Sequence, residues 1–379
     1  MAVLLAFAAG TAAANLYYNQ PMLGLMAGEL GIGGNIGLIT TFTQLGYTGG
    51  MLLLVPLGDR LDRKRMILAE CFVLVLAAAA SAISPNFAWL AIASVVVGVN
   101  ATIAQLIIPL AADLASPAKR GQAVGTVFSG VLAGILLART LSGAVGQTFG
   151  WRAMYWCAAG VALGLGILLS FKLPRVKARS SLPYKELLRS MVNLLFRHSS
   201  LRRACGVQAC LFAGFSAFWS ILALLLEGPD YGMGAAVAGA FGIIGLVGIG
   251  IASWGGRLAD RYGPRTGTGV GIVSSGIAFL IFAGVPTIAG LVAGVIFLDL
   301  GIALAQVSNQ SMILGLDEDA RSRINTIYVT AIFSGGTLGS AMASFAWQWA
   351  GWMAVSLLGL TLAAIALLIH LGGRDEARA

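Results

Sequence analysis

Apolar runs of about 20 residues follow one another along nearly the whole chain, with short polar loops between them. A helix rises about 1.5 Å per residue, so a run of that length crosses the ~30 Å hydrocarbon core of a membrane. Only 10% of the 379 residues are charged, whereas soluble domains carry about 25%. The pattern excludes a water-soluble chain and predicts an all-α membrane protein.

The lengths of these runs predict about twelve membrane helices. In the first half they lie near residues 3–26, 36–57, 66–84, 87–114, 121–148 and 152–173. In the second half they lie near residues 202–226, 234–256, 266–285, 287–315, 324–349 and 352–371. We therefore predict an N-terminal bundle over 1–173, a basic linker over 174–200 and a C-terminal bundle over 201–379.

The two halves match each other at a constant offset of 201 residues. The matching pairs are Asp59 and Asp260, Arg120 and Arg321, Gln105 and Gln306, and Trp151 and Trp352. Six spans separate the copies, so both keep the same orientation, and the chain forms two pseudo-symmetric six-helix bundles. Parallel repeats with a site at their interface are a recurring plan among transporters.

Basic residues gather in alternate loops. Arg60–Arg65 and Arg257–Arg265 fall on one predicted side of the membrane, while the other side holds mainly acidic residues such as Glu29 and Glu227. Because Lys and Arg are retained on the cytoplasmic side, we expect both termini in the cytoplasm. The net charge of +9 follows from this asymmetry, so we expect no nucleic-acid partner.

The linker is the only long polar segment, with nine basic residues and one acidic residue between Lys172 and Arg203. Inside it, Leu187, Leu188, Met191, Leu194 and Leu195 recur at helical spacing. This predicts an amphipathic helix that lies on the inner leaflet, attracted by anionic lipid. A binding site for a regulatory partner is the alternative.

Residues of the types that form catalytic and metal sites are few in this sequence and do not cluster. The four cysteines lie in apolar runs without CxxC spacing, and the two histidines, His198 and His370, lie at segment ends. Metal sites and disulfide frameworks need closer clusters of these residues. We predict no metal, no cofactor and no enzymatic activity.

The loop after the second predicted helix reads Val55-Pro-Leu-Gly-Asp59-Arg60-Leu-Asp-Arg63-Lys64, and the second half repeats it as Gly256-Arg-Leu-Ala-Asp260-Arg261-Tyr-Gly-Pro-Arg265. Both copies resemble the G-x-x-x-D-R-x-G-R-R loop of the major facilitator superfamily, and the resemblance extends over essentially the whole chain. It implies the twelve-helix fold of that family, a monomer in the bacterial inner membrane, and a small-molecule solute, protons and the lipid bilayer as partners.

Within this loop we expect Arg60 or Arg63 to pair with Asp113 at the end of the fourth predicted helix. Such a pair would act as a latch that holds one conformation and is released in another. Asp59 would cap a neighbouring helix, where a carboxylate contributes ~0.3–1 kcal/mol. The alternative is that the loop serves topology and folding alone.

Three segments resemble the drug and sugar efflux branch of the family, and the arabinose-efflux permeases in particular: Asn15–Pro21, Arg321–Thr326 and Gly335–Gly339. The resemblance implies proton-coupled efflux (antiport) of a drug-like or sugar-like solute by alternating access. Uptake by symport or facilitated diffusion would use the same fold. A sensor or membrane enzyme is disfavoured because no soluble domain or catalytic cluster is evident. The antiporter motif of the fifth helix departs from the family, with Arg139 at its proline position.

Ionisable groups deep in a membrane cost ~2.5–3.5 kcal/mol on insertion scales and are functional by default. Asp299 and Arg139 both fall near the middle of predicted spans. We expect them to pair in at least one conformation and to couple transport to protons. A permanent structural ion pair is the alternative. Glu70, nearer a span end, is expected to be solvated or paired with a loop.

Amides and aromatic rings cluster in the first, fourth, seventh and tenth predicted helices, which line the cavity in the family that the chain resembles. The cavity candidates are Asn15, Tyr17, Tyr18, Asn19, Gln20, Asn100, Gln105, Gln208, Phe215, Trp219, Gln306, Asn309 and Gln310. Such a set suits a neutral or weakly cationic amphipathic solute. Interhelical hydrogen bonding and packing are the alternative roles.

Overall fold

The computed structural model describes residues 1–58, 60–116, 119–174, 183–244, 263–317 and 320–372. Within these ranges the chain is helical with short connections, and nine helices are long and apolar enough to cross a membrane. The longer helices are α3 (Leu38–Leu57), α4 (Arg63–Ala82), α5 (Phe87–Asn100), α6 (Ile103–Leu114), α7 (Arg120–Phe149), α8 (Trp151–Lys172), α9 (Tyr184–Arg197), α10 (Ser199–Glu227), α12 (Pro264–Gly284), α13 (Ile288–Leu314) and α14 (Arg321–Leu371). The protein is therefore a multi-pass membrane protein.

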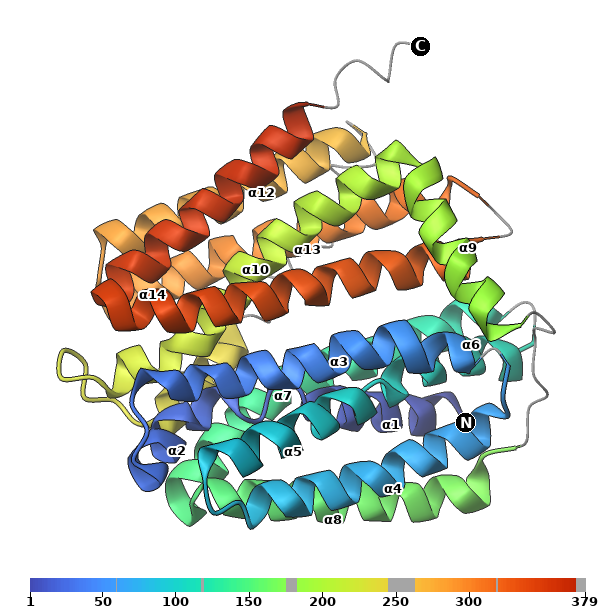
Figure 1. The fold of residues 1–379 in the computed structure, drawn as a ribbon, viewed down its shortest axis with the longest axis horizontal. Coiled ribbons are helices and arrows are strands. Elements are labelled where there is room, and N and C mark those ends of the chain that lie inside the picture. The colour runs from blue at the N-terminus through green and yellow to red at the C-terminus, as the bar shows by residue number, and fades with distance from the viewer. Residues whose placement is uncertain (59, 117–118, 175–182, 245–262, 318–319, 373–379) are drawn as a thin grey trace. The chain divides into compact units, whose positions relative to one another are not determined.

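The helices form two compact units. The first unit contains Met1–Leu187 and Leu226–Ala240, and the second contains Leu188–Leu225 and Phe241–Ala379. In the first unit α3 lies beside α5, and α4 beside α8 (Figure 1). In the second unit α12 lies beside both α13 and α14. The short segment Leu226–Ala240 packs with the first unit, although the sequence analysis placed it in the C-terminal bundle.

The first predicted span is broken in its middle. Instead of one helix near 3–26, the chain forms α1 (Ala2–Ala14), a 3₁₀ turn (Gln20–Met22) and α2 (Leu23–Leu30). Pro21 has no backbone N–H, so an α-helix cannot continue through it without losing a hydrogen bond. The backbone tightens instead, and Met22 N bonds to the Asn19 carbonyl at 3.0 Å.

The internal repeat is visible in the backbone. Gly150 has φ +83° before Trp151, and Gly351, 201 residues later, has φ +60° before Trp352. Few residues other than glycine adopt positive φ at low cost. In both copies a glycine thus sets the turn between two consecutive spans, and the indole Nε1 of the following tryptophan donates a hydrogen bond.

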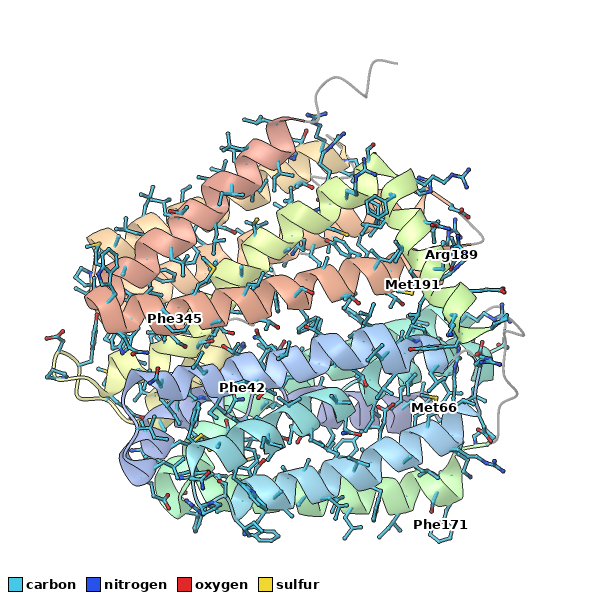
Figure 2. All side chains as sticks on the ribbon, viewed as in Figure 1. Phe42, Met66, Phe171, Arg189, Met191 and Phe345 are labelled. Carbon is cyan, nitrogen blue, oxygen red and sulfur yellow. The ribbon has the colours of Figure 1, made fainter. Side chains whose placement is uncertain are left out.

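Large apolar side chains point away from the helix packing, as expected of a surface covered by lipid. Phe171 on α8 is 82% exposed and Phe345 on α14 is 63% exposed; Figure 2 labels both. A water-soluble protein rarely exposes apolar surface so extensively.

The amphipathic helix of the linker is present as α9, but its apolar face does not lie open to lipid. Leu187, Met191 and Leu194 are buried within the protein, while Val192 and Phe196 are exposed. Leu188 and Leu195 of the same stripe are partly buried, and the expectation that the helix rests on the inner leaflet stays a prediction. Spacing identified the helix, but spacing does not distinguish a protein surface from a lipid surface as the partner of an apolar stripe.

Candidate functional site

Arg139 lies at the centre of a buried polar cluster in the first unit. It is 3% exposed on α7. Its Nε donates to Gln20 Oε1 at 2.8 Å, and its guanidinium carbon lies 4.7 Å from the ring centroid of Tyr17. The break in the first span brings both partners against α7. The arrangement holds a cation in the protein interior through a charge-assisted hydrogen bond and a cation–π contact.

Three of the predicted cavity amides form hydrogen bonds within the first unit. Asn19 donates to Thr43 Oγ1 at 2.8 Å and accepts from the Thr40 hydroxyl at 3.3 Å, so it fastens the 3₁₀ turn to α3. The amides of Asn15 and Asn100 donate to carbonyls of the preceding helical turn. All three residues are buried, and their bonds are of the interhelical and local kind considered from sequence, so their role in solute binding stays a prediction.

Gln105 and Tyr18 complete the predicted set in the first unit. Gln105, half-buried on α6, donates from Nε2 to the Tyr47 hydroxyl of α3 at 3.0 Å. Tyr18 is buried beside the broken segment. The tyrosine–glutamine pair lies on helices of the same unit as Arg139, and its hydroxyl and amide can exchange partners with a solute.

Glu70 is not solvated, which corrects the expectation from sequence. It is 6% exposed on α4. The Thr102 hydroxyl donates to its Oε2 at 3.2 Å, while Oε1 is buried and has no hydrogen-bond partner among the described residues. An ionisable group in this setting is a candidate proton carrier, and the sequence analysis missed it.

The second unit carries an aromatic cluster on α10 and α14. Phe212 stacks on Phe215 with centroids 5.3 Å apart, and Phe333 meets Phe212 edge-on at 5.1 Å. Trp219 continues the row, 6.0 Å from Phe215. Such rings present a flat apolar wall suited to aromatic or amphipathic molecules.

Gln208 lies one helical turn before Phe212 and is fully buried. Neither its amide oxygen nor its amide nitrogen has a hydrogen-bond partner among the described residues. A buried polar group left unpaired costs ~1–3 kcal/mol. A solute that hydrogen-bonds to this amide would remove that cost.

The other candidates of the second unit lie on α13. Gln310 donates to Asn325 Oδ1 at 2.8 Å, which joins α13 to α14, and the Thr268 hydroxyl lies 3.1 Å from Asn309 Oδ1. Gln306 and Asp299 are half-buried. Arg139 belongs to the first compact unit and Asp299 to the second. Their pairing stays a prediction.

The charged loop contains the ion pair considered from sequence. Arg63 Nη1 lies 2.8 Å from Asp113 Oδ2, and Arg63 Nε donates to the Gly58 carbonyl at 3.1 Å. Asp62 caps α4 by accepting from Lys64 N at 2.9 Å. The role of the Arg63–Asp113 pair as a latch stays a prediction.

The remaining loop residues divide into two groups. Arg60 is exposed, and Lys64 Nζ donates to the Ser170 carbonyl. Asp59, Asp260 and Arg261 lie outside the described residues, so the capping predicted for Asp59 stays a prediction. Arg265, at the start of α12, donates to the His370 carbonyl at 3.3 Å.

The helix Ala235–Ile244 touches α7 one turn from Arg139. A Cβ added to Gly143 would overlap the Ala235 carbonyl oxygen, and one added to Gly239 would overlap the Arg139 carbonyl oxygen. The Thr140 hydroxyl donates to the Gly239 carbonyl at 3.2 Å. Because glycine has no side chain, the two backbones can pack closely at Gly143 and Gly239, as small residues allow between membrane helices.

Gly143→Ala is expected to lower the thermal unfolding midpoint of the purified protein, because the added methyl must push the two helices apart at a cost of ~1–3 kcal/mol. Gly125→Ala, on the same helix with open space around it, is the matched control and is expected to leave the midpoint equal or higher, since alanine favours helix. Equal shifts in both variants would show that the close contact has no energetic role.

The sequence model of the Major Facilitator Superfamily matches residues 5–340. This chain belongs to the major facilitator superfamily. YgaY of Escherichia coli O157:H7, described as an uncharacterized transporter, is 36% identical over 379 residues, covering 99% of this chain and 96% of YgaY. Chloramphenicol efflux pump Rv0191 of Mycobacterium tuberculosis is 26% identical, covering 79% of this chain and 76% of the pump.

Among solved structures, the nucleoside transporter NupG superposes with a TM-score of 0.77 at 14% identity, covering 98% of each chain. At that identity the likeness concerns the fold alone. Together the matches show a major facilitator superfamily transporter rather than an enzyme, with the all-α fold of that superfamily.

Proposed function

We propose that this transporter is a proton-coupled exporter that moves a small amphipathic solute by alternating access across the bacterial inner membrane, with both termini in the cytoplasm. The buried Arg139 carries the proposal. A cation held by Gln20 and Tyr17 at a break in the first span is costly, and a membrane protein retains such a group for function. Discontinuous helices are typical of binding and coupling sites in transporters.

The aromatic row and the buried amide of Gln208 favour a neutral or weakly cationic solute with a ring. Phe212, Phe215 and Trp219 offer apolar and cation–π contacts, while Gln208 offers an amide donor and an amide acceptor, neither with a hydrogen-bond partner among the described residues. The name of the efflux pump from Mycobacterium tuberculosis supports export, and chloramphenicol is the first solute to test.

Two carboxyl groups are the proposed proton carriers. Asp299 would pair with Arg139 in one conformation and take up a proton in the other. Glu70 would act within the first unit, where the Thr102 hydroxyl donates to one oxygen and the other, which has no hydrogen-bond partner in the described part of the chain, would carry the proton.

Transport by the purified protein in liposomes with an imposed pH gradient tests the proposal. Chloramphenicol, cationic dyes and sugars are supplied in turn. Accumulation against the solute gradient, lost when the pH difference is collapsed, would establish proton-driven transport. Movement only down the solute gradient would identify a facilitator and contradict proton coupling.

Asp299→Asn and Glu70→Gln separate the two carriers. Each substitution keeps the shape of the side chain and removes its titration. We expect Asp299→Asn to abolish accumulation while solute counterflow continues, because counterflow needs no net proton movement. If Glu70→Gln alone has that effect, the coupling site lies in the first unit, and if neither does, both assignments are wrong.

A further inference from the structure

A cavity of about 280 Å³ in the second unit has a cationic lining that the transport proposal does not use. It lies where α10 and α12 begin and where α13 and α14 end. Its polar lining residues are Ser200, Arg203, Arg265, Thr268, Asn309 and His370. No carboxylate is among the described residues that line it, so its electrostatic character is positive.

The donors of the cavity converge from different helices. Arg203 comes from α10 and Arg265 from α12, and Arg265 is positioned by its bond to the His370 carbonyl. The backbone adds to this charge. Helix α12 begins at the cavity with Pro264, and its N-cap residue Gly263 supplies no side-chain cap. The N-terminus of α12, which is the positive end of the helix dipole, therefore lies at the cavity without a capping side chain.

The cavity wall also contains a buried amide. Asn309 is 3% exposed, and its Nδ2 has no hydrogen-bond partner among the described residues. Its Oδ1 lies 3.1 Å from the Thr268 hydroxyl, which leaves the nitrogen as the group available to an anion. Two guanidinium groups and an amide donor suit a phosphate, whose oxygens accept several charge-assisted bonds at once.

An apolar groove continues from this cavity and indicates the source of the phosphate. The groove, of about 460 Å³, shares Arg265 and His370 with the cavity and extends along Gly269, Val270, Val273 and Leu371. These three apolar side chains are exposed on the outside of α12 and α14. A charged pocket that opens into an apolar groove has the form of a phospholipid headgroup followed by its acyl chain.

We propose that this cavity binds the phosphate headgroup of an anionic membrane lipid, with an acyl chain along the groove of α12 and α14. Basic pockets between membrane helices bind such headgroups in other proteins. Apart from Asn309, which was a cavity candidate from sequence, the polar residues that line this site are not among the proposed solute contacts. The site draws together the ends of four helices that an alternating-access cycle would move. Bound lipid would therefore stabilise the second unit in the arrangement that forms the cavity.

The test measures thermal unfolding of the full-length protein, delipidated in a neutral detergent, with added phosphatidylglycerol, phosphatidylcholine or inorganic phosphate. We expect phosphatidylglycerol to raise the midpoint and phosphatidylcholine to raise it less. The double variant Arg203→Gln, Arg265→Gln is expected to bind phosphatidylglycerol at least about tenfold more weakly, from the loss of two charge-assisted bonds.

The control with matched charge is Arg202→Gln. Arg202 neighbours Arg203 on α10 but is exposed and donates to carbonyls at the end of α9 rather than lining the cavity. It should retain the lipid response. Gly269→Leu is a second, uncharged variant. A Cβ at Gly269 already lies 3.3 Å from His370 Nε2, and His370 lines both the cavity and the groove. Leucine at this position therefore fills the groove beside His370 while both arginines remain, and the lipid response should be lost.

A lipid response that survives in both the arginine double variant and Gly269→Leu overturns the proposal. Stabilisation by inorganic phosphate without any response to phosphatidylglycerol overturns the lipid assignment and identifies a site for soluble phosphate. If the double variant does not fold, native mass spectrometry of bound phosphatidylglycerol on Gly269→Leu and Arg202→Gln decides the question, because equal occupancy of the two contradicts the site.

Discussion

Arg139→Gln is expected to reduce proton-driven solute accumulation at least about tenfold. The substitution removes the positive charge on α7 that contacts Gln20 and Tyr17. A hydrogen bond to a charged group contributes about 1.5–3 kcal/mol. Because about 1.4 kcal/mol corresponds to a tenfold change in an equilibrium, a loss of this size predicts an effect of at least about tenfold. Initial rates of uptake into inverted vesicles, normalised to the amount of protein, measure the effect.

Two further variants define what Arg139 contributes. Arg139→Lys keeps the charge but loses the planar group that binds Gln20 while stacking on Tyr17, so partial transport is expected. Arg120→Gln removes an exposed charge from the first turn of the same helix and serves as the control. Normal accumulation by Arg139→Gln would exclude the arginine from coupling and leave it a structural role.

Arg63→Ala is expected to be the most destabilising single change at the charged loop. The Arg63–Asp113 pair is buried, with side chains 5% and 12% exposed and 2.8 Å between them. Removing one partner of a buried pair leaves the other charge uncompensated and costs about 3–5 kcal/mol. The free energy of unfolding in mixed detergent micelles measures the loss.

The neighbouring pair provides the comparison. Arg65 lies 3.9 Å from Asp62 and is 77% exposed, so Arg65→Ala should cost at most about 1 kcal/mol. The double variant Arg63→Ala, Asp113→Asn should recover part of the stability lost by Arg63→Ala, because no buried charge then lacks a partner. Equal costs for Arg63→Ala and Arg65→Ala would show that the buried pair contributes no more than an exposed one.

The membrane helices were predictable because lipid imposes one simple requirement. Every span must be apolar for about 20 residues, so the limits of α3, α4 and α8 lie within a few residues of the predicted spans. Pro21 accounts for an irregularity in the first span, because it has no backbone N–H. The extent of that break depends on bonds such as Asn19 to Thr43, and these arise only when α3 packs against it.

Glu70 shows where the sequence was insufficient. It shares a helix face with Ile67, Cys71 and Leu74, all buried, and this spacing of three or four residues is present in the sequence. In a soluble helix such spacing would reveal the buried face. In a membrane span the opposite face is equally apolar, because lipid covers it, so periodicity does not show which way a single acidic residue faces.

The division of the chain between the two units has a consequence for its biosynthesis. Leu226–Ala240 packs with the first unit although it follows most of α10. The faces of α7 around Gly143 and Thr140 are therefore not covered until Ala235 and Gly239 have been inserted. The first unit therefore cannot reach its final packing when Met1–Leu187 have been translated; it must wait for Leu226–Ala240, which are made only after the linker and most of α10.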